Sequence, residues 1–125
     1  MLQRRFTTTA YSREMKWSDS EKSVGCRAFK DALKLELDDV IEEAKRRMES
    51  VTQPDGLWDL QEFLTRRRNQ IDAQFDFRYS VLPMVFATLL RQKKISASEL
   101  EGLSEEKIEF VRCMAKTFDR LGEGW

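Results

Sequence analysis

Residues 57–90 read LWDLQEFLTRRRNQIDAQFDFRYSVLPMVFATLL, and the rest of the chain is organised around them. Apolar side chains recur there at steps dominated by three and four residues, at Leu57, Leu60, Leu64, Ile71, Phe75, Leu82, Val85, Phe86 and Leu89. This spacing predicts helix with one buried stripe. Arg68 and Arg78 occupy stripe positions, whereas Trp58 lies off the stripe among polar positions. A charge on the apolar stripe and a tryptophan on the polar side indicate a surface for another protein.

Periodicity leaves two interpretations open for each of these residues. Arg66 and Arg67 are interpreted as a solvated helical face with local ion pairs, each worth about 0.3–0.5 kcal/mol. Arg68 either pairs with Asp72 on that face or packs its stem in the stripe and reaches a carboxylate across a subunit or partner boundary. Trp58 either closes the end of a helical hairpin or is an exposed anchor for binding.

A long first helix is predicted before this stretch. Ser18 and Glu21 have the spacing of a capping box that opens a helix. Apolar residues then follow a near-heptad seam, at Phe29, Leu33, Leu37, Val40, Ala44, Met48 and Val51. The breaker cluster TQPDG at 52–56 suits a tight antiparallel connection to a second helix from about Leu57 to the neighbourhood of Tyr79. Residues 1–17 are interpreted as a flexible arm, with Trp17 as its anchor.

Shorter helices are predicted after this stretch. Pro83 predicts a kink, or a new helix starting near Ser80, and the apolar run 81–90 is expected in the core. Residues 96–99 are expected to form a turn and a short helical piece. The last helix should open at 104–106 and end at Gly122, and its predicted buried face is Ile108, Val111, Ala115 and Phe118.

The predicted fold class is all-α, because no strand period is found in the sequence. We expect one domain, 1–125, made of the arm (1–17), a long antiparallel helical hairpin or stalk (about 18–79) and a small helical head (about 80–125). A two-helix hairpin of this length buries only one stripe per helix. The remaining apolar positions therefore predict a homodimer, with two-fold symmetry as the commonest arrangement.

Composition excludes several classes of function. The 22 basic residues balance the 22 acidic ones, which argues against a dedicated nucleic-acid binder. The chain contains no histidine and no metal-binding, phosphate-loop or nucleophile motif, so we expect no enzyme activity, metal or cofactor. Cys26 and Cys113 are interpreted as small buried hydrophobes in a reducing, cytoplasmic compartment. No apolar run is long enough to span a membrane.

The central motif resembles the cyanobacterial fluorescence recovery protein family. The similar stretch runs from Leu57 to Leu64, with Glu62 as a departure, and continues at Arg68, Ile71, Asp72, Asp76, Arg78, Ser80, Val81, Val85, Phe86 and Ala87. Upstream, Trp17, Ser18, Phe29, Ala32, Glu36 and Leu37 are in register without a gap. The likeness covers about 17–107, and the last helix matches only loosely.

This resemblance implies a partner and a site. Members of the family are helical homodimers that bind the photoactivated red form of the orange carotenoid protein, mainly through its C-terminal domain. They speed its return to the orange form and help it leave the phycobilisome, which ends photoprotective quenching. The family's functional patch corresponds in this chain to Trp58, Glu62 and Arg68, with Glu62 where an aspartate is usual. Head residues with a role are placed loosely around Met84 and Lys107. A partner at the phycobilisome would place the protein in the cytoplasm or at the cytoplasmic face of the thylakoid membrane.

Two other functions compete with this one. The same dimer could serve as a generic helical adaptor for a different partner, which co-purification would reveal. Alternatively, the arginine run 66–68 could bind nucleic acid, which a salt titration would test. The zero net charge ranks nucleic acid last.

Overall fold

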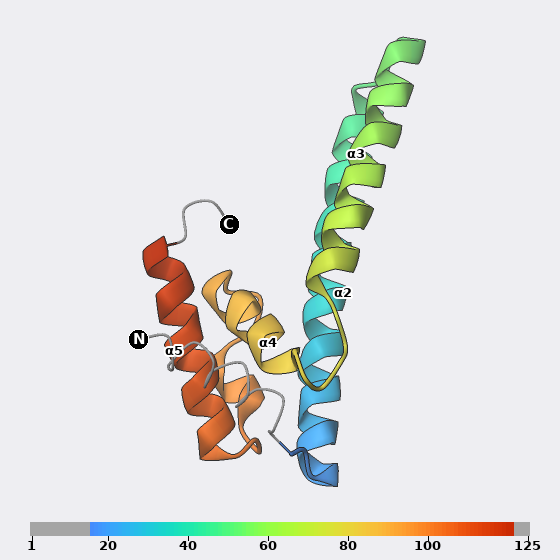
Figure 1. The fold of residues 1–125 in the computed structure, drawn as a ribbon. Helices are drawn as coiled ribbons and strands as arrows, with labels where there is room; N and C mark the ends of the chain where they lie inside the picture. Colours follow the sequence, from blue (N-terminus) through green and yellow to red (C-terminus); the bar gives the residue numbers. More distant parts are fainter. Residues whose placement is uncertain (1–15, 122–125) are drawn as a thin grey trace.

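The computed structural model of the chain describes residues 16–121, all of its regular elements being helices. They are α2 (Asp19–Glu49), α3 (Pro54–Gln74), α4 (Leu82–Arg91), the short 3₁₀ helix η1 (Ala97–Leu100) and α5 (Glu105–Leu121). The long antiparallel pair α2 and α3 forms a stalk, and α4 and α5 form a head beside the N-terminal half of α2 (Figure 1). The predicted all-α class with a stalk and a head is therefore confirmed. The predicted arm at 1–15 and the helix end at Gly122 lie outside the described residues.

The observed helix starts agree with some of the predicted boundaries and correct another. The capping box at the start of α2 is present, because Ser18 accepts from the Glu21 amide and Glu21 accepts from the Ser18 amide. The predicted start of the second helix was three residues late. The helix begins at Pro54, whose fixed φ suits the first turn and whose missing N–H is not needed there. Pro83 likewise lies in the first turn of α4, so the predicted break before it is confirmed.

The predicted end of the second helix near Tyr79 was wrong, since α3 ends at Gln74 and leaves 75–81 as a connection. Aromatic packing explains the early end. The rings of Phe75 and Phe77 meet Phe29 of α2 edge-on, at centroid distances of 5.5 and 5.0 Å. Tyr79 continues the series, 5.3 Å from Phe77 and 5.3 Å from Trp17. The connection therefore follows α2 instead of continuing α3, and Trp17 is packed against the core as predicted.

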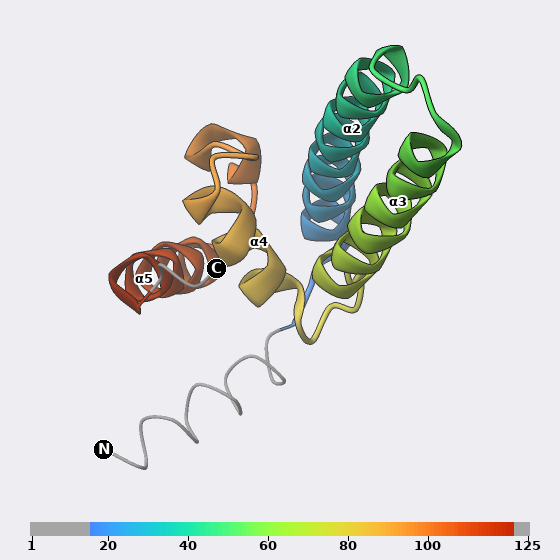
Figure 2. The same ribbon diagram turned by 90° about the horizontal axis from the view of Figure 1, so that it is seen from above.

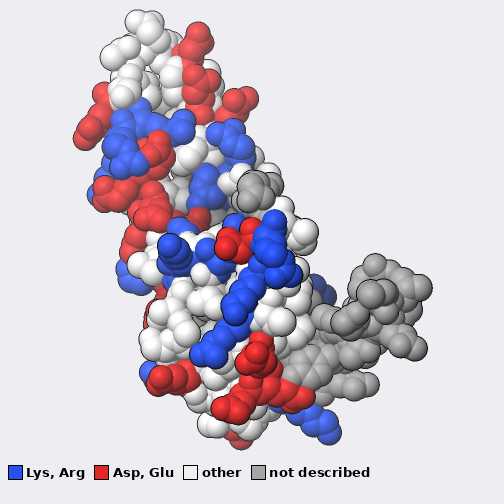
Figure 3. Space-filling model, turned by 90° about the vertical axis from the view of Figure 1, so that its left-hand side faces the viewer, with Lys and Arg blue, Asp and Glu red and all other residues white. Residues whose placement is uncertain are grey.

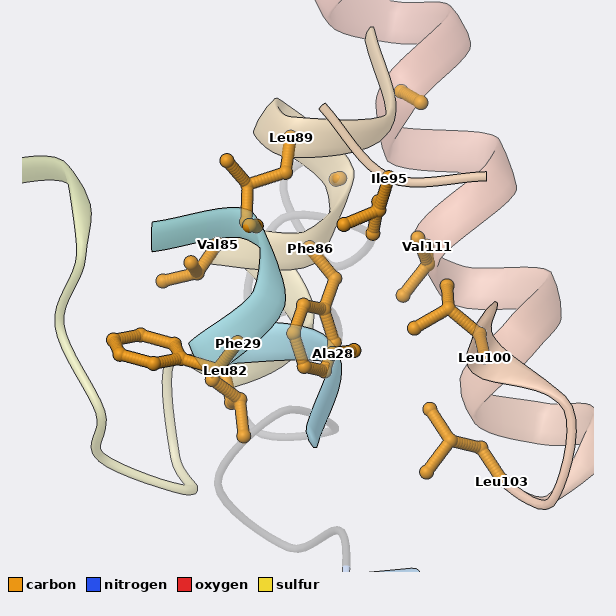
Figure 4. Packing of buried hydrophobic residues seen from close by; sticks show 13 residues of the cluster. Ala28, Phe29, Leu82, Val85, Phe86, Leu89, Ile95, Leu100, Leu103 and Val111 are labelled. Carbon is orange, nitrogen blue, oxygen red and sulfur yellow. The ribbon is translucent and has the colours of Figure 1, made fainter. Parts of the chain in front are cut away.

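The hydrophobic core lies between the head and the N-terminal half of α2, and not along the α2–α3 pair. In two views at right angles, α4 lies between the α2–α3 hairpin and α5 (Figures 1 and 2). Phe86 of α4 is fully buried, with side chains from α2, η1 and α5 around it (Figure 4). The other buried apolar residues of this cluster are Ala28, Phe29, Ala32, Leu82, Val85, Ala87, Leu89, Ile95, Leu100, Leu103, Val111 and Ala115. The predicted faces of the 81–90 run and of the last helix are confirmed, with Ile108 and Phe118 partly buried beside the core.

A polar cluster joins the stalk to the head. Glu36 of α2 forms ion pairs with Arg67 of α3 and with Lys94, whose amine lies 2.8 Å from Glu36 Oε1 and 3.2 Å from Asp39 Oδ2. The interpretation of Arg67 as part of a solvated face was therefore wrong, because its side chain crosses the hairpin. Burial alone would raise the pKa of Glu36, but hydrogen bonds and charges from Lys94 and Arg67 hold this pKa below its usual value.

Removing the charge of Glu36 should destabilise the fold. In the Glu36→Gln variant, Arg67 and Lys94 lose their common charged partner. We expect the free energy of unfolding to fall by about 1–3 kcal/mol, a range that already allows for solvent screening of these partly exposed groups. Urea unfolding measures this loss. Asp38→Asn provides the matched control, because Asp38 pairs with Lys34 on the exposed side of the same helix and should contribute about 0.5 kcal/mol or less. Equal losses in the two variants would contradict a special role for Glu36.

Glu36 should also make stability depend on pH in a defined direction. A carboxyl group whose pKa is lower in the folded chain stabilises fully above its unfolded pKa, about 4.3, and loses this contribution as pH falls through the folded value. Wild-type stability should therefore fall below about pH 4. The fall should be shallower in Glu36→Gln, as thermal melts from pH 7 to pH 3 would measure.

Candidate functional site

The stalk exposes a row of large apolar side chains on both of its helices. They are Leu37, Ile41 and Met48 of α2 and Leu57 and Leu64 of α3, which together are called the apolar face. Leu37, Met48, Leu57 and Leu64 belong to the predicted buried stripes, so the prediction is not met for these four residues within one protomer. Ile71 of the predicted stripe is buried, and so is Phe63, with the Arg47 guanidinium 4.1 Å from the centre of its ring.

Helix geometry places both halves of the apolar face on the same side of the stalk. Ala28 and Ala32 of α2 pack against the head, and Leu37 and Ile41 follow them at a spacing of two and a half helical turns, so they lie on the opposite side of α2. On α3, Gln70 lines a groove toward the head, and Leu64 lies on the flank away from it. The apolar face therefore looks away from the head and is open to solvent.

The three residues of the predicted patch, Trp58, Glu62 and Arg68, are all exposed on α3. Trp58 is 59% exposed and Glu62 follows one turn later on the outer side of the helix. Glu62 also lines a shallow hollow of about 800 Å³ along the outside of α3. Trp58 thus does not close the hairpin against α2, and its exposure favours the interpretation as a binding anchor.

Arg68 lies at the edge of the apolar face, one turn after Leu64. Its side chain is 83% exposed and its Nε lies 3.9 Å from Asp72 Oδ2, the local pair predicted for it. A pair of this length between exposed groups contributes little, so the guanidinium remains available to another carboxylate. Arg68 therefore places an accessible positive charge beside exposed hydrophobic surface.

The two head candidates, Met84 and Lys107, differ from this patch and from each other. Met84 of α4 is half-buried and lines an open groove of about 800 Å³ between α3 and α4. Lys107 of α5 is buried and forms an ion pair with Glu21. The structure therefore does not bring either of them together with Trp58, Glu62 and Arg68 in one pocket.

No metal site is evident among residues 16–121. No cluster of three histidine, cysteine, aspartate or glutamate side chains in this part of the chain could hold a metal ion. Cys26 is half-buried, but Cys113 is exposed on α5, so the prediction of a buried Cys113 was wrong. None of the described helices is both long and apolar enough to cross a lipid bilayer.

Comparisons with known proteins cover nearly all of the described chain. A family profile described as photoprotection regulator fluorescence recovery protein matches residues 17–115. The chain belongs to the fluorescence recovery protein family. It is 34% identical over 103 residues to the fluorescence recovery protein of Synechocystis sp., across 82% of this chain and 94% of that protein.

Solved structures of fluorescence recovery proteins agree with the fold. The Synechocystis sp. PCC 6803 protein has a TM-score of 0.76 at 34% identity, over 81% of this chain and 99% of its own. The Fremyella diplosiphon protein has a TM-score of 0.75 at 33% identity, with the same coverage. The match includes the stalk, the connection and most of α5, so the chain is a photoprotection regulator with both parts of the family fold.

Proposed function

We propose that this protein binds the photoactivated red form of the orange carotenoid protein, mainly through that protein's C-terminal domain, and accelerates its return to the orange form. This action would help the partner leave the phycobilisome and end photoprotective quenching. The supporting observation is that a chain of this family exposes Trp58, Glu62 and Arg68 together on one helix of the stalk. Tryptophan and arginine are the residue types most enriched at binding hot spots.

The working form in this proposal is a homodimer. Its support is the apolar face, whose five large side chains are exposed on the stalk of one protomer. Exposed apolar surface of this kind favours association, and a two-fold arrangement would cover the same face of both copies. Arg68 lies at the edge of this face, so dimerisation would place it at the rim of the interface, where a third molecule can still reach it.

The proposed action makes or breaks no covalent bond in the partner. It therefore needs no general base such as histidine, which the chain lacks. The regulator would instead bind the transition state, or a compact intermediate, of the partner more tightly than the partner's open red form. Each 1.4 kcal/mol of this preference gives about a tenfold faster return. Trp58 and apolar residues such as Met84 would supply binding, while Arg68 and Glu62 would orient the partner.

The decisive measurement is red-to-orange recovery in darkness. A few per cent of regulator per carotenoid protein should accelerate recovery severalfold, because one dimer acts on many partners in turn. The red form should also co-elute with the regulator in size-exclusion chromatography. Failure of both results would contradict the proposal, and co-elution of a different partner from the native host would favour the adaptor function instead.

Charge distribution gives no support to nucleic-acid binding. Basic and acidic side chains alternate in small groups from the stalk to the base of the head, and neither sign forms a continuous surface on this face (Figure 3). Fluorescence titration with random DNA at low salt should show negligible binding. A cytoplasmic position, including the cytoplasmic face of the thylakoid membrane, is part of the proposal because the phycobilisome is there.

A further inference from the structure

The N-terminal ends of α2 and α5 meet where the stalk joins the head, and one carboxylate accepts hydrogen bonds at both helix ends. Glu21 of α2 accepts hydrogen bonds from the amide of Ser18, at 3.0 Å, and from the amide of Ser104, at 2.7 Å. Both amides are donors that a helix leaves unpaired at its start. A negative charge is also favoured there by the helix dipole. Glu21 therefore caps its own helix and one that begins 84 positions later in the sequence.

Lys107 completes this arrangement from α5. Its amine lies 3.2 Å from each carboxylate oxygen of Glu21, donates to the carbonyl of Lys16 and sits 5.1 Å from the centre of the Trp17 ring. The side chains of Lys107 and Glu21 are only 5% and 11% exposed. We call Glu21, Lys107, Ser18, Ser104 and Trp17 the clasp. Its charged groups are covered by the chain and offer little surface to a partner.

Two glycines allow the elements around the clasp to approach closely. A Cβ at Gly25 would lie 3.1 Å from the Trp17 ring. Gly102 has a φ of +108°, and a Cβ there would lie 2.7 Å from Cγ2 of Val24. Side chains at these positions would push Trp17 or the loop before α5 away from α2. The separation of α2 and α5 is therefore set closely by the sequence.

We propose that Glu21 and Lys107 are positioning residues, which hold α5 on α2 and thereby fix the orientation of the head relative to the patch on the stalk. This inference rests on the proposed function. α4 packs on α5 and carries Met84, so a loosened α5 would also free the head surface from its fixed place. A partner that contacts head and stalk together binds more tightly when both are already oriented. Lys107 then acts through Glu21 and not by touching the partner.

Amide hydrogen exchange on the full chain tests the first part. Breaking a buried pair by removing one partner leaves an uncompensated charge, so Glu21→Gln and Lys107→Met should each speed exchange in α5 by roughly 100-fold. The double variant lacks both charges, so the amides of its α5 should exchange no faster than those of the faster-exchanging single variant. Lys107→Arg keeps a cation against Glu21 and should restore most of the protection. Lys116→Met, on the exposed side of the same helix, is the matched control and should be silent.

The same variants in the recovery assay test the second part. Glu21→Gln and Lys107→Met should each reduce the acceleration of recovery about tenfold, and the double variant should lose no more than the worse single. Three results would overturn the proposal: unchanged exchange in α5, faster exchange with full activity, or activity lost in Lys107→Met but kept in Glu21→Gln. The last would mean that Lys107 touches the partner. A wild type that fails to accelerate recovery would overturn the proposed function, and exchange would still show whether the clasp holds the head.

Discussion

Arg68→Leu is expected to slow regulator-dependent recovery by roughly 30-fold, which corresponds to about 2 kcal/mol for one hot-spot residue. The leucine continues the apolar face after Leu64, and since the arginine is 83% exposed the fold should not change. What is lost is a guanidinium at the edge of an apolar surface, able to bind a carboxylate with two parallel hydrogen bonds. Recovery of the orange form in darkness measures the effect, and circular dichroism checks that the helices are intact.

Two further variants separate charge, shape and position at this site. Arg68→Lys keeps the charge but loses the planar fork, so it should recover only part of the activity. Lys116→Leu removes an exposed positive charge from α5, away from the patch on α3, and should change recovery less than about twofold. Equal losses at Lys116 and Arg68 would mean that net charge matters and the proposed site does not.

Local sequence signals predicted the helices and most of the head. The capping box at Ser18, the breaker before α3 and Pro83 each act within a few residues, so their effect is readable without the fold. The apolar run of α4 is nearly continuous, which is typical of a buried helix, and Leu82, Phe86 and Leu89 are fully buried. The apolar period alone also identified Trp58 and Arg68 as anomalies.

Contacts between distant segments could not be predicted in the same way. Glu36 and Arg67 look like ordinary surface charges in a helical pattern, and Glu21 looks like a local cap residue. Only the fold shows that Glu36 pairs with Arg67 and Lys94, and that Glu21 pairs with Lys107. The end of α3 was missed for a similar reason, because Phe75 satisfies the helical period and yet packs on α2. A period reports which positions are apolar, but not which neighbour covers them.

The apolar face allows a sharp test of the proposed dimer, because α2 carries two leucines of similar exposure on opposite sides. Leu37 is 44% exposed and lies on the apolar face, whereas Leu35 is 52% exposed and points about 160° away around the helix. Leu37→Glu should weaken self-association by roughly 100-fold or more, since a two-fold interface would bury an unpaired carboxylate twice. Leu35→Glu should leave the dimer unchanged. Analytical ultracentrifugation over a range of concentrations measures both.

The same pair of variants links assembly to activity. Because Leu37 is next to Glu36, which reaches Arg67, it lies at about the level of Arg68 along the stalk. Loss of the partner copy would remove the surface that the second stalk is proposed to place beside Arg68. We therefore expect Leu37→Glu to lose recovery activity at low concentration and to regain part of it at concentrations where the dimer re-forms. Full activity in a variant that stays monomeric would separate the proposed site from the dimer, and a monomeric wild type would remove the role proposed for the apolar face.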